Sequence, residues 1–458
     1  MRRRVEWILL VACLVVAGVT ACSSSNEQTA PSSTARAARA GDRGGVPEGY
    51  PLDHDVVAPL VVSSLGADPI PVAGTDGKIH VVYELEILNA APRPATVTRI
   101  DTLAGGADGP VVATIGPDDV RARSLLVAGY GAPFTEIPVG RTAVVLLDDV
   151  FAARGDVPAT ANHRVQATFG AAPSAELGPV AARYPDSVTQ IGGVVHASNR
   201  RPVVLGPPVA GDGWVATNGC CGNTSHRGAV VPASGRLNAT ERFAIDFVRL
   251  DPDVDGVVTH RGDGTKNDDY LAYGAPLLAV ADGTVVSIQS DVPDSTPQHV
   301  PTDLAIEQLG GNHVILDIGG GSYVYYAHMV PGSATVKVGD TVKRGQVIGK
   351  LGNSGNSSEA HLHLHVTRAP VPLAGDNVPY EFDRFTDVGA LSGDAVEAGP
   401  EAGTRTDQLP LDGSVIDFPS PEGQSGPSST KPAGSPHRLR NVTSRAGWRA
   451  ATPHRPVG

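Results

Sequence analysis

The sequence predicts a mainly β protein, and three observations support this prediction. The chain of 458 residues has 54 Gly and 38 Pro but only 8 Phe, 3 Trp and 2 Met, a composition that favours turns and short strands over long helices. Apolar and polar residues alternate over residues 78–88 and again over residues 361–366, as in strands that turn one face to a core. The chain has no helical repeat or heptad pattern. Its length predicts two or three domains.

The N-terminus predicts export from the cytoplasm. Basic residues 2–4 precede an apolar core at residues 7–19, which is the layout of a secretory signal peptide over residues 1–21. The ending Val-Thr-Ala-Cys is similar to a bacterial lipobox, which implies lipidation of Cys22 and an anchor on the outer face of the cytoplasmic membrane. An ordinary secreted protein is the alternative. The Ser-rich residues 22–54 are typical of a flexible tether.

Residues 55–172 are predicted to form an immunoglobulin-like β-sandwich. The run 78–88 alternates, so we expect a half-buried strand with Ile79, Val81, Tyr83, Leu85 and Ile87 on one face and His80, Glu84 and Glu86 on the other. Similar runs occur at residues 141–151 and 164–171, and turn-rich connections separate the runs. Because the region has no cluster of catalytic residue types, we interpret it as a spacer or a module that binds a protein partner.

The rest of the chain divides into three parts. Residues 173–236 are rich in Pro and Gly and are predicted to be a connecting segment that lies against the next domain. A second β domain is expected over residues 237–390, where short apolar runs alternate with Gly turns. Residues 391–458 lack apolar periodicity, so we predict that they are disordered.

Charge and cysteine content limit the partners and the covalent framework. The net charge of −12 argues against nucleic acid as a partner, because phosphate binding needs a concentrated basic surface. With Cys13 removed in the signal peptide and Cys22 lipidated, only Cys220 and Cys221 remain. A bond between neighbours about 3.8 Å apart at Cα across a trans peptide would be strained. A disulfide, two free thiols and metal ligation together with His226 all stay open for this pair.

Three histidines at every second position indicate chemistry. His361, His363 and His365 share one face of a predicted strand, while Leu362, Leu364 and Val366 face the core. Two such imidazoles can reach one metal ion, which favours a metal or catalytic site over structural histidines. Upstream, Asp246 stands in an otherwise apolar strand, where a carboxylate is costly unless something such as a metal ion pairs with it. His328 ends another predicted strand and can face the same cleft.

The second β domain resembles the lysostaphin-type zinc endopeptidases, which cut peptidoglycan cross-bridges. The resemblance rests on the runs APLLAVADGTVV, GNHVIL, YYAHM, VKVGDTVKRGQVIGKLGNSGNS and HLH. It implies an antiparallel β-sheet peptidase domain, zinc as cofactor and peptidoglycan peptides as substrate. It also implies that Asp246 and His363 ligate zinc, whose bound water, as hydroxide, attacks a peptide carbonyl. His361 would then take and return the proton, and His328 would stabilise the oxyanion.

The sequence departs from the family pattern at Arg242, which stands four residues before Asp246, in the place of the first ligand histidine. Arginine cannot ligate zinc, because it stays protonated and has no lone pair to offer. In one interpretation Arg242 shares a strand face with Asp246 and replaces the metal by an ion pair, which leaves a degenerate homologue that binds peptidoglycan or regulates another wall hydrolase. In the other, His365 is the substitute ligand, or His226 or His260 completes the site.

Overall fold

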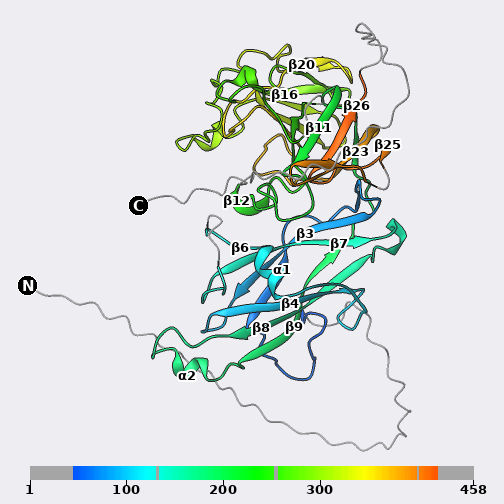
Figure 1. Ribbon diagram of the computed structural model, residues 1–458. Helices are drawn as coiled ribbons and strands as arrows, with labels where there is room; N and C mark the ends of the chain where they lie inside the picture. Colours follow the sequence, from blue (N-terminus) through cyan, green and yellow to red (C-terminus); the bar gives the residue numbers. More distant parts are fainter. Residues whose placement is uncertain (1–44, 130–133, 252–255, 400–401, 421–458) are drawn as a thin grey trace, which may run out of the picture. The chain divides into compact units, whose positions relative to one another are not determined.

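The computed structural model describes residues 45–129, 134–251, 256–399 and 402–420, and the protein is mainly β with antiparallel sheets, as the sequence predicts (Figure 1). Residues 46–458 form one unit. The predicted signal peptide, Cys22, most of the predicted tether and the chain beyond residue 420 lie outside the described residues. No helix within the described ranges is long and apolar enough to cross a membrane.

Two sheets pack face to face in the N-terminal domain. The first sheet contains β1 (Leu60–Ser64), β2 (Val72–Ala73), β3 (Ile79–Asn89), β6 (Ser124–Leu126) and β7 (Thr142–Phe151), and the second contains β4 (Ala95–Ala104), β5 (Val111–Ile115), β8 (Thr160–Phe169) and β9 (Ser187–His196). Leu85 of β3 and Val145 of β7 share a core with Ile100 of β4 and Val165 of β8. The helical elements among these strands are short: α1 (Pro117–Ala122), η1 (Arg154–Asp156) and α2 (Gly178–Ala181). The immunoglobulin-like topology stays a prediction.

The N-terminal domain extends beyond the predicted boundary at residue 172. Strand β9 pairs with β8 along most of its length, so part of the predicted connecting segment belongs to the second sheet. The sequence indicated a loop here because of glycines such as Gly193. In the structure Gly193 has a φ of +66° and lies beside a register shift in the β8–β9 ladder. A Cβ at this position would lie 2.8 Å from Cδ2 of Leu85, so glycine is required where sequence alone indicates a loop.

Strand β3 is buried on both faces, and the prediction of a half-buried strand is wrong in this respect. Val81, Tyr83, Leu85 and Ile87 enter the sandwich core as expected. Val82 on the opposite face joins the core of the C-terminal domain, and Glu84 beside it is 0% exposed. One small apolar cluster continues this contact, in which Val144 and Leu146 of β7 pack with Leu65 and Ala239. The polar face of β3 therefore meets protein, not water.

One large sheet organises the C-terminal domain. Its order is β19-β16-β17-β18-β21-β14-β11-β26-β23-β24, with β25 paired to β23. The bounds are β11 (Gly211–Thr217), β14 (Ile245–Arg249), β16 (Gly283–Gln289), β17 (Asn312–Asp317), β18 (Tyr323–Met329), β19 (Thr341–Val342), β21 (Leu362–Thr367), β23 (Phe385–Ser392), β24 (Ala395–Glu397), β25 (Gly403–Arg405) and β26 (Ser414–Phe418). Three two-stranded pairs accompany it: β10 (Val203–Leu205) with β22 (Tyr380–Phe382), β12 (Val230–Ala233) with β13 (Arg236–Ala239), and β15 (Pro276–Leu278) with β20 (Val347–Lys350). The 3-10 turns are η2 (Asn267–Asp269) and η3 (Ile306–Gln308).

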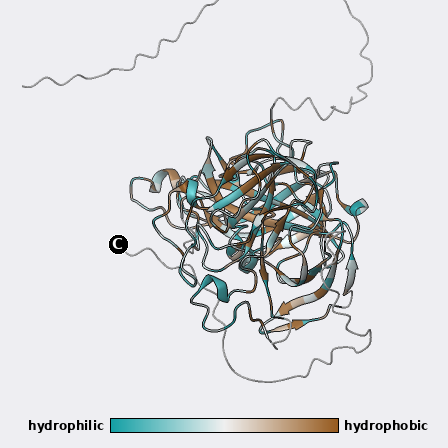
Figure 2. Ribbon diagram, turned by 90° about the horizontal axis from the view of Figure 1, so that it is seen from above, coloured by the Kyte–Doolittle hydropathy of each residue, from teal (hydrophilic) through white to brown (hydrophobic). Residues whose placement is uncertain are grey.

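Apolar side chains from one face of the large sheet, together with those of the elements packed on it, fill the C-terminal core, which includes Trp214, Phe247, Leu362, Leu364 and Phe382. Figure 2 shows hydrophobic residues along many of the strands and hydrophilic residues in many of the connections. The large sheet also includes residues that we expected to be disordered. Strand β26 lies between β11 and β23, although its run of five residues is too short to give a periodic signal.

A buried polar network crosses the N-terminal core. The Tyr83 hydroxyl lies 2.6 Å from Oδ2 of Asp149 and 2.7 Å from Nε2 of His163, whose Nδ1 donates to the Gly193 carbonyl oxygen at 2.7 Å. Since His163 Nε2 then needs a donor, the single Tyr83 proton can satisfy it only if Asp149 is protonated and donates to Tyr83. Burial raises the pKa of Asp149 to about 6, so the protonated form that this count requires is populated below that pH and is lost above it.

Asp149→Asn is expected to increase the free energy of unfolding relative to wild type at pH 7.5 and to change it little at pH 4. The folded pKa of about 6 exceeds the usual 3.8, so the folded state binds more protons between these values and the contribution of Asp149 to stability falls as the pH rises through this window. The amide supplies the missing donor at any pH. Urea unfolding at both pH values measures the difference, with the exposed Asp108→Asn as control; equal effects at pH 4 and pH 7.5 would contradict the assignment.

Candidate metal centre

Strand register places the first two predicted ligands opposite each other. In the antiparallel pair of β14 and β21, Asp246 is the direct partner of His363, and on the other side of β21 His363 pairs with Ala327 of β18. The apolar residues that alternate with the histidines along β21 are fully buried in the core, as the pattern predicted. They are Leu362, Leu364 and Val366. The alternation of β21 therefore fixes His363 toward a carboxylate in the adjacent strand.

Asp246 is the centre of a cluster of donors. Its side chain is 10% exposed, and its Oδ1 lies 3.0 Å from Nδ1 of His363 and 3.4 Å from Nε2 of His361. Its Oδ2 lies 3.2 Å from Nε2 of His226 and accepts a hydrogen bond from Nδ2 of Asn218 at 2.8 Å. Burial raises the pKa of Asp246, but His226 and His361 lower it more, so it lies well below its usual value. Asp246 is therefore an ionised carboxylate among imidazoles.

His226 reaches this centre from the segment between β11 and β12. Its Nδ1 lies 3.2 Å from the carbonyl oxygen of Ala244, which directs Nε2 toward Asp246. The ring stands edge-on to that of His363, with 4.7 Å between centroids. Burial lowers the pKa of His226, but Asp246 raises it more, to about 9. Of the histidines proposed to complete the site, the structure brings His226 into it.

Arg242 does not pair with Asp246, so that prediction is wrong. Strand β14 begins only at Ile245, and Arg242 lies in the preceding turn, so the two side chains do not share a strand face. Nε of Arg242 lies 3.1 and 3.0 Å from the two carboxylate oxygens of Glu84, and its NH2 group binds the same carboxylate. The guanidinium thus points to the N-terminal domain and leaves Asp246 to the histidines.

His328 and His361, the two predicted catalytic histidines, lie together beside the cluster, with ring centroids 4.6 Å apart. Nδ1 of His361 lies 2.9 Å from the carbonyl oxygen of Glu359, and Nδ1 of His328 lies 2.7 Å from that of Ser354. Each ring therefore donates from Nδ1 and presents Nε2. Burial and the neighbouring His361 and His363 hold the pKa of His328 well below its usual range. His328 also has a φ of 60°, which is uncommon for a residue other than glycine.

The other two candidate substitutes lie outside the ligand set. Nδ1 of His365 is 2.9 Å from Nε2 of His363, and its ring is tilted against that of Tyr325. His365 is thus an outer partner of His363, and its assignment as substitute ligand is not supported by this geometry. His260 packs against Tyr270 instead, with 5.3 Å between ring centroids.

The side chains of His226, Asp246 and His363 fit a zinc ion. Each offers one ligand atom, and these atoms lie within 4.8 Å of one another. Two imidazole nitrogens and a carboxylate oxygen are a common ligand set of catalytic zinc, in which a fourth position stays open. The contact with His365 supports this set, because a partner on Nε2 of His363 fixes Nδ1 as the ligating atom.

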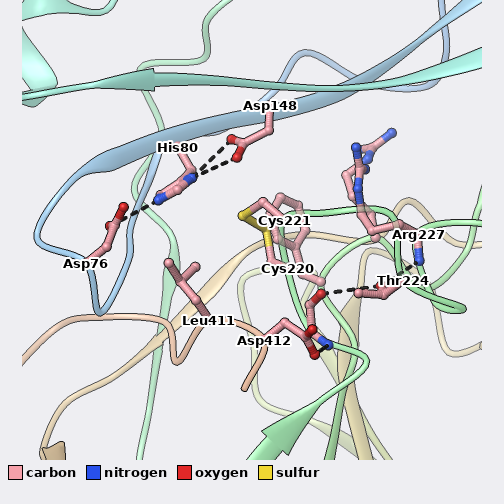
Figure 3. The surroundings of a disulfide bond; sticks show 12 residues. Asp76, His80, Asp148, Cys220, Cys221, Thr224, Arg227, Leu411 and Asp412 are labelled. Atoms are coloured by element: carbon pink, nitrogen blue, oxygen red, sulfur yellow. Dashed lines mark hydrogen bonds and ion pairs between the residues drawn. A yellow bond between two sulfur atoms is a disulfide. The ribbon is translucent and has the colours of Figure 1, made fainter. Parts of the chain in front are cut away.

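Cys220 and Cys221 form a disulfide with each other, which settles the three alternatives for this pair (Figure 3). The peptide between them is cis and the Cα atoms are 3.0 Å apart, in place of the trans peptide assumed from sequence. Figure 3 shows His80 and Asp148 near the disulfide. These two side chains and Cys221 lie close enough for a metal site, but Cys221 is in a disulfide and so offers no thiolate ligand. We assign no metal to them.

Sequence reasoning missed two residues of the site region. Asn218 contacts Asp246 from a turn that has no periodic pattern. Glu84 binds Arg242 across 158 residues of sequence, and it was expected to face solvent. An Arg in the place of a ligand was the only local signal that a buried anion lies nearby.

Comparison with known proteins identifies relatives of the C-terminal domain. Residues 267–375 match Peptidase family M23, which confirms the resemblance inferred from sequence. The peptidoglycan DD-endopeptidase ShyA of Vibrio cholerae is 30% identical over 150 residues, which are 32% of this chain and 29% of that protein. ShyC, from the same organism and with the same activity in its name, is 31% identical over 116 residues, or 25% and 22% of the two chains. The chain therefore spans less than a third of each of these relatives.

Among solved structures, the catalytic domain of lysostaphin from Staphylococcus simulans is 19% identical, covering 38% of this chain and 86% of that one with a TM-score of 0.19. The family match contains His328, His361 and His363 but begins after His226 and Asp246. Two of the three candidate ligands thus lie outside the matched residues.

His226→Ala, Asp246→Ala and His363→Ala are each expected to remove bound zinc, because each takes one of three ligands from the site. His260→Ala should keep close to one zinc per chain, because His260 packs against Tyr270 outside the cluster. His365→Ala should retain more zinc than the three ligand variants, because it removes only an outer partner of His363. Elemental analysis of the purified full chain, loaded with zinc and dialysed, measures the content. Zinc retained in His226→Ala but lost in His365→Ala would reverse the assignment of the third ligand.

Proposed function

We propose, from the premise that residues 267–375 carry a Peptidase family M23 domain, that the protein is a zinc metalloendopeptidase that hydrolyses a peptide bond in peptidoglycan. The observation that carries the proposal is the buried group of His226, Asp246 and His363 beside the pair of His328 and His361. The names of the Vibrio cholerae relatives, both peptidoglycan endopeptidases, support the choice of substrate.

His226, Asp246 and His363 would hold the zinc, which when bound supplies a Lewis acid and lowers the pKa of water. His361 presents Nε2 beside Asp246, with its Nδ1 proton held by the Glu359 carbonyl, so it can accept a proton there. His328 is oriented in the same way by Ser354. A neutral ring held so can accept but not donate at Nε2, so stabilisation of an oxyanion by His328 requires that the pair first takes up a proton.

We therefore assign the transferred proton to the pair of His328 and His361 as a unit. Their rings are in contact and interact electrostatically, so the proton belongs to the pair and either ring can return it to the leaving amine. The left-handed backbone at His328 is consistent with a ring that must be held in one place.

A degenerate homologue that binds peptidoglycan without cutting it is the second candidate. The observation in its favour is Arg242, which occupies the position of an inherited ligand. His226 supplies a third ligand at the same carboxylate, and we therefore favour the enzyme.

His361→Ala is expected to reduce cleavage of purified peptidoglycan by about 100-fold or more while the zinc content stays near one per chain, because the residue moves a proton and does not ligate the metal. Release of new amino groups from the peptidoglycan measures cleavage. His313→Ala, which alters a half-buried histidine on β17, is the control and should cleave like wild type. A zinc-loaded wild type that binds peptidoglycan without releasing amines would favour the degenerate homologue.

We also propose that the protein is exported and anchored to the outer face of the cytoplasmic membrane through lipid on Cys22. The support is the sequence of basic, apolar and small residues that ends at this cysteine. That the N-terminal domain binds a separate protein partner stays a prediction. The face of its β3 opposite the sandwich core contacts the C-terminal domain.

Cys22→Ala is expected to move the full-length protein from the membrane pellet to the soluble fraction of a bacterial host, because it removes the atom that carries the lipid. Cys13→Ala alters a cysteine inside the apolar core and should leave the protein in the pellet. Immunoblots of the fractions measure the distribution. A Cys22→Ala protein that still sediments with membranes would contradict the lipid anchor.

A further inference from the structure

A second buried carboxylate comes from the N-terminal domain and contacts two arginines that lie near the candidate ligands in sequence. Glu84 of β3 is fully buried and contacts two buried guanidiniums, those of Arg227 and Arg242. Burial alone raises the pKa of Glu84, but Arg242 and Arg227 lower it more. NH2 of Arg227 also donates to the carbonyl oxygen of Leu147 at 3.0 Å, and NH2 of Arg242 donates to that of Leu65 at 3.4 Å.

Each guanidinium belongs to a segment that delivers one side chain to the metal centre. Arg227 is the residue after His226, and Arg242 precedes Asp246 by four residues. Asp246 and His226 are held in place in different ways, however. Asp246 lies within β14 and is fixed by ladder bonds to β11 and β21. His226 lies in a stretch between β11 and β12 that has no strand, so no ladder fixes it, and local turn bonds and side-chain contacts set its position.

Backbone and side-chain contacts together hold this stretch. The amides of Gly228 and Ala229 donate to the carbonyl oxygens of Thr224 and His226, each at 3.0 Å. The Thr224 hydroxyl donates to the carbonyl oxygen of Asn218 at 3.0 Å, and Nδ1 of His226 lies 3.2 Å from that of Ala244. Arg227 is the one residue adjoining His226 that is itself fully buried, and its charged end is held by Glu84 and Leu147 of the N-terminal domain. One anchor of the backbone next to His226 is thus a neighbouring side chain inserted into the other domain.

We propose that the N-terminal domain is part of the metal site, in that Glu84 holds Arg227 as a positioning residue for the ligand His226. The inference rests on the proposed zinc site. It gives the N-terminal domain a role beyond that of a spacer, because the third ligand would be properly placed only while the two domains stay in contact. Outer contacts of this kind commonly tune metal affinity by about 10 to 100-fold.

The test separates positioning from simple cohesion of the domains. Arg227→Met removes the arm next to His226 but leaves Glu84 paired with Arg242, so no carboxylate is left without a cation. It also removes a buried Nε that has no hydrogen-bond partner among the described residues. Arg242→Met is the matched control, since it deletes the other guanidinium of the same carboxylate and leaves Glu84 with Arg227. Both changes replace a buried arginine by a side chain of similar length.

The zinc dissociation constant of the full chain is measured by competition with a chromophoric chelator, beside the thermal midpoint of the zinc-free protein. Arg227→Met is expected to weaken zinc binding by about tenfold or more with a thermal midpoint near that of wild type, while Arg242→Met keeps the wild-type affinity. In the His226→Ala background, Arg227→Met should cause no further loss, because it acts through His226. Should Arg227→Met not fold, Arg227→Lys, which loses the contact with Leu147, should give a smaller loss in the same direction.

The outcomes are distinguishable. A wild type that binds no zinc overturns the proposed function and the inference with it. Zinc held equally by wild type and Arg227→Met overturns the inference alone. Equal losses in Arg227→Met and Arg242→Met, or a further loss in the His226→Ala background, would assign the cluster to cohesion of the domains and also overturn it.

Discussion

The structure around the site depends on the pairing of buried carboxylates with positive charge. Asp246 lies in the middle of an apolar strand, between neighbours that fill the core, and removing a carboxylate from water is costly unless cations or donors surround it. Three histidines and Asn218 meet this requirement. A zinc ion at the same place would meet it with one divalent cation. The cluster of imidazoles is therefore both a means of burying Asp246 and a set of ligands and bases for chemistry.

Glu84 imposes the same requirement from the other domain, and it is met by the two arginines that flank the metal-binding side chains. The two buried carboxylates are thus connected through short stretches of chain, from His226 to Arg227 and from Arg242 to Asp246. Arg242 contributes one of the two cations that pair with the buried Glu84, so its guanidinium belongs to the contact between the domains and leaves Asp246 to the histidines.

The sequence was most informative where a pattern of period two has a physical consequence. The alternation in β21 predicted which residues are buried in the core and which share a face with Asp246, and pairing of adjacent strands brought His363 and Asp246 together. It was least informative for contacts between segments distant in sequence. Nothing in the run that contains Glu84 shows that a second domain covers its polar face. The sequence did not predict that β9 belongs to the N-terminal domain, because Gly193, which suggests a loop, lies at a register shift within the β8–β9 ladder. It did not predict β26 because five residues are too few to show a periodic pattern.

In the proposed zinc site the three candidate ligands are held in different ways. Strand pairing fixes Asp246 and His363 in the sheet, where a change of register would turn either side chain to the opposite face. The third ligand needs only a nitrogen at the correct distance, so it can come from any segment that passes near the carboxylate. Ordering an irregular segment costs conformational entropy, and rigid contacts on both sides of the ligand reduce what must be lost when metal binds. Arg227 inserted into the N-terminal domain on one side and the bonded Cys220–Cys221 pair on the other supply such contacts for His226. A loop can therefore supply a ligand of the proposed site, provided that the loop is anchored elsewhere. For His226 one such anchor is the contact of Arg227 with Glu84 in the N-terminal domain.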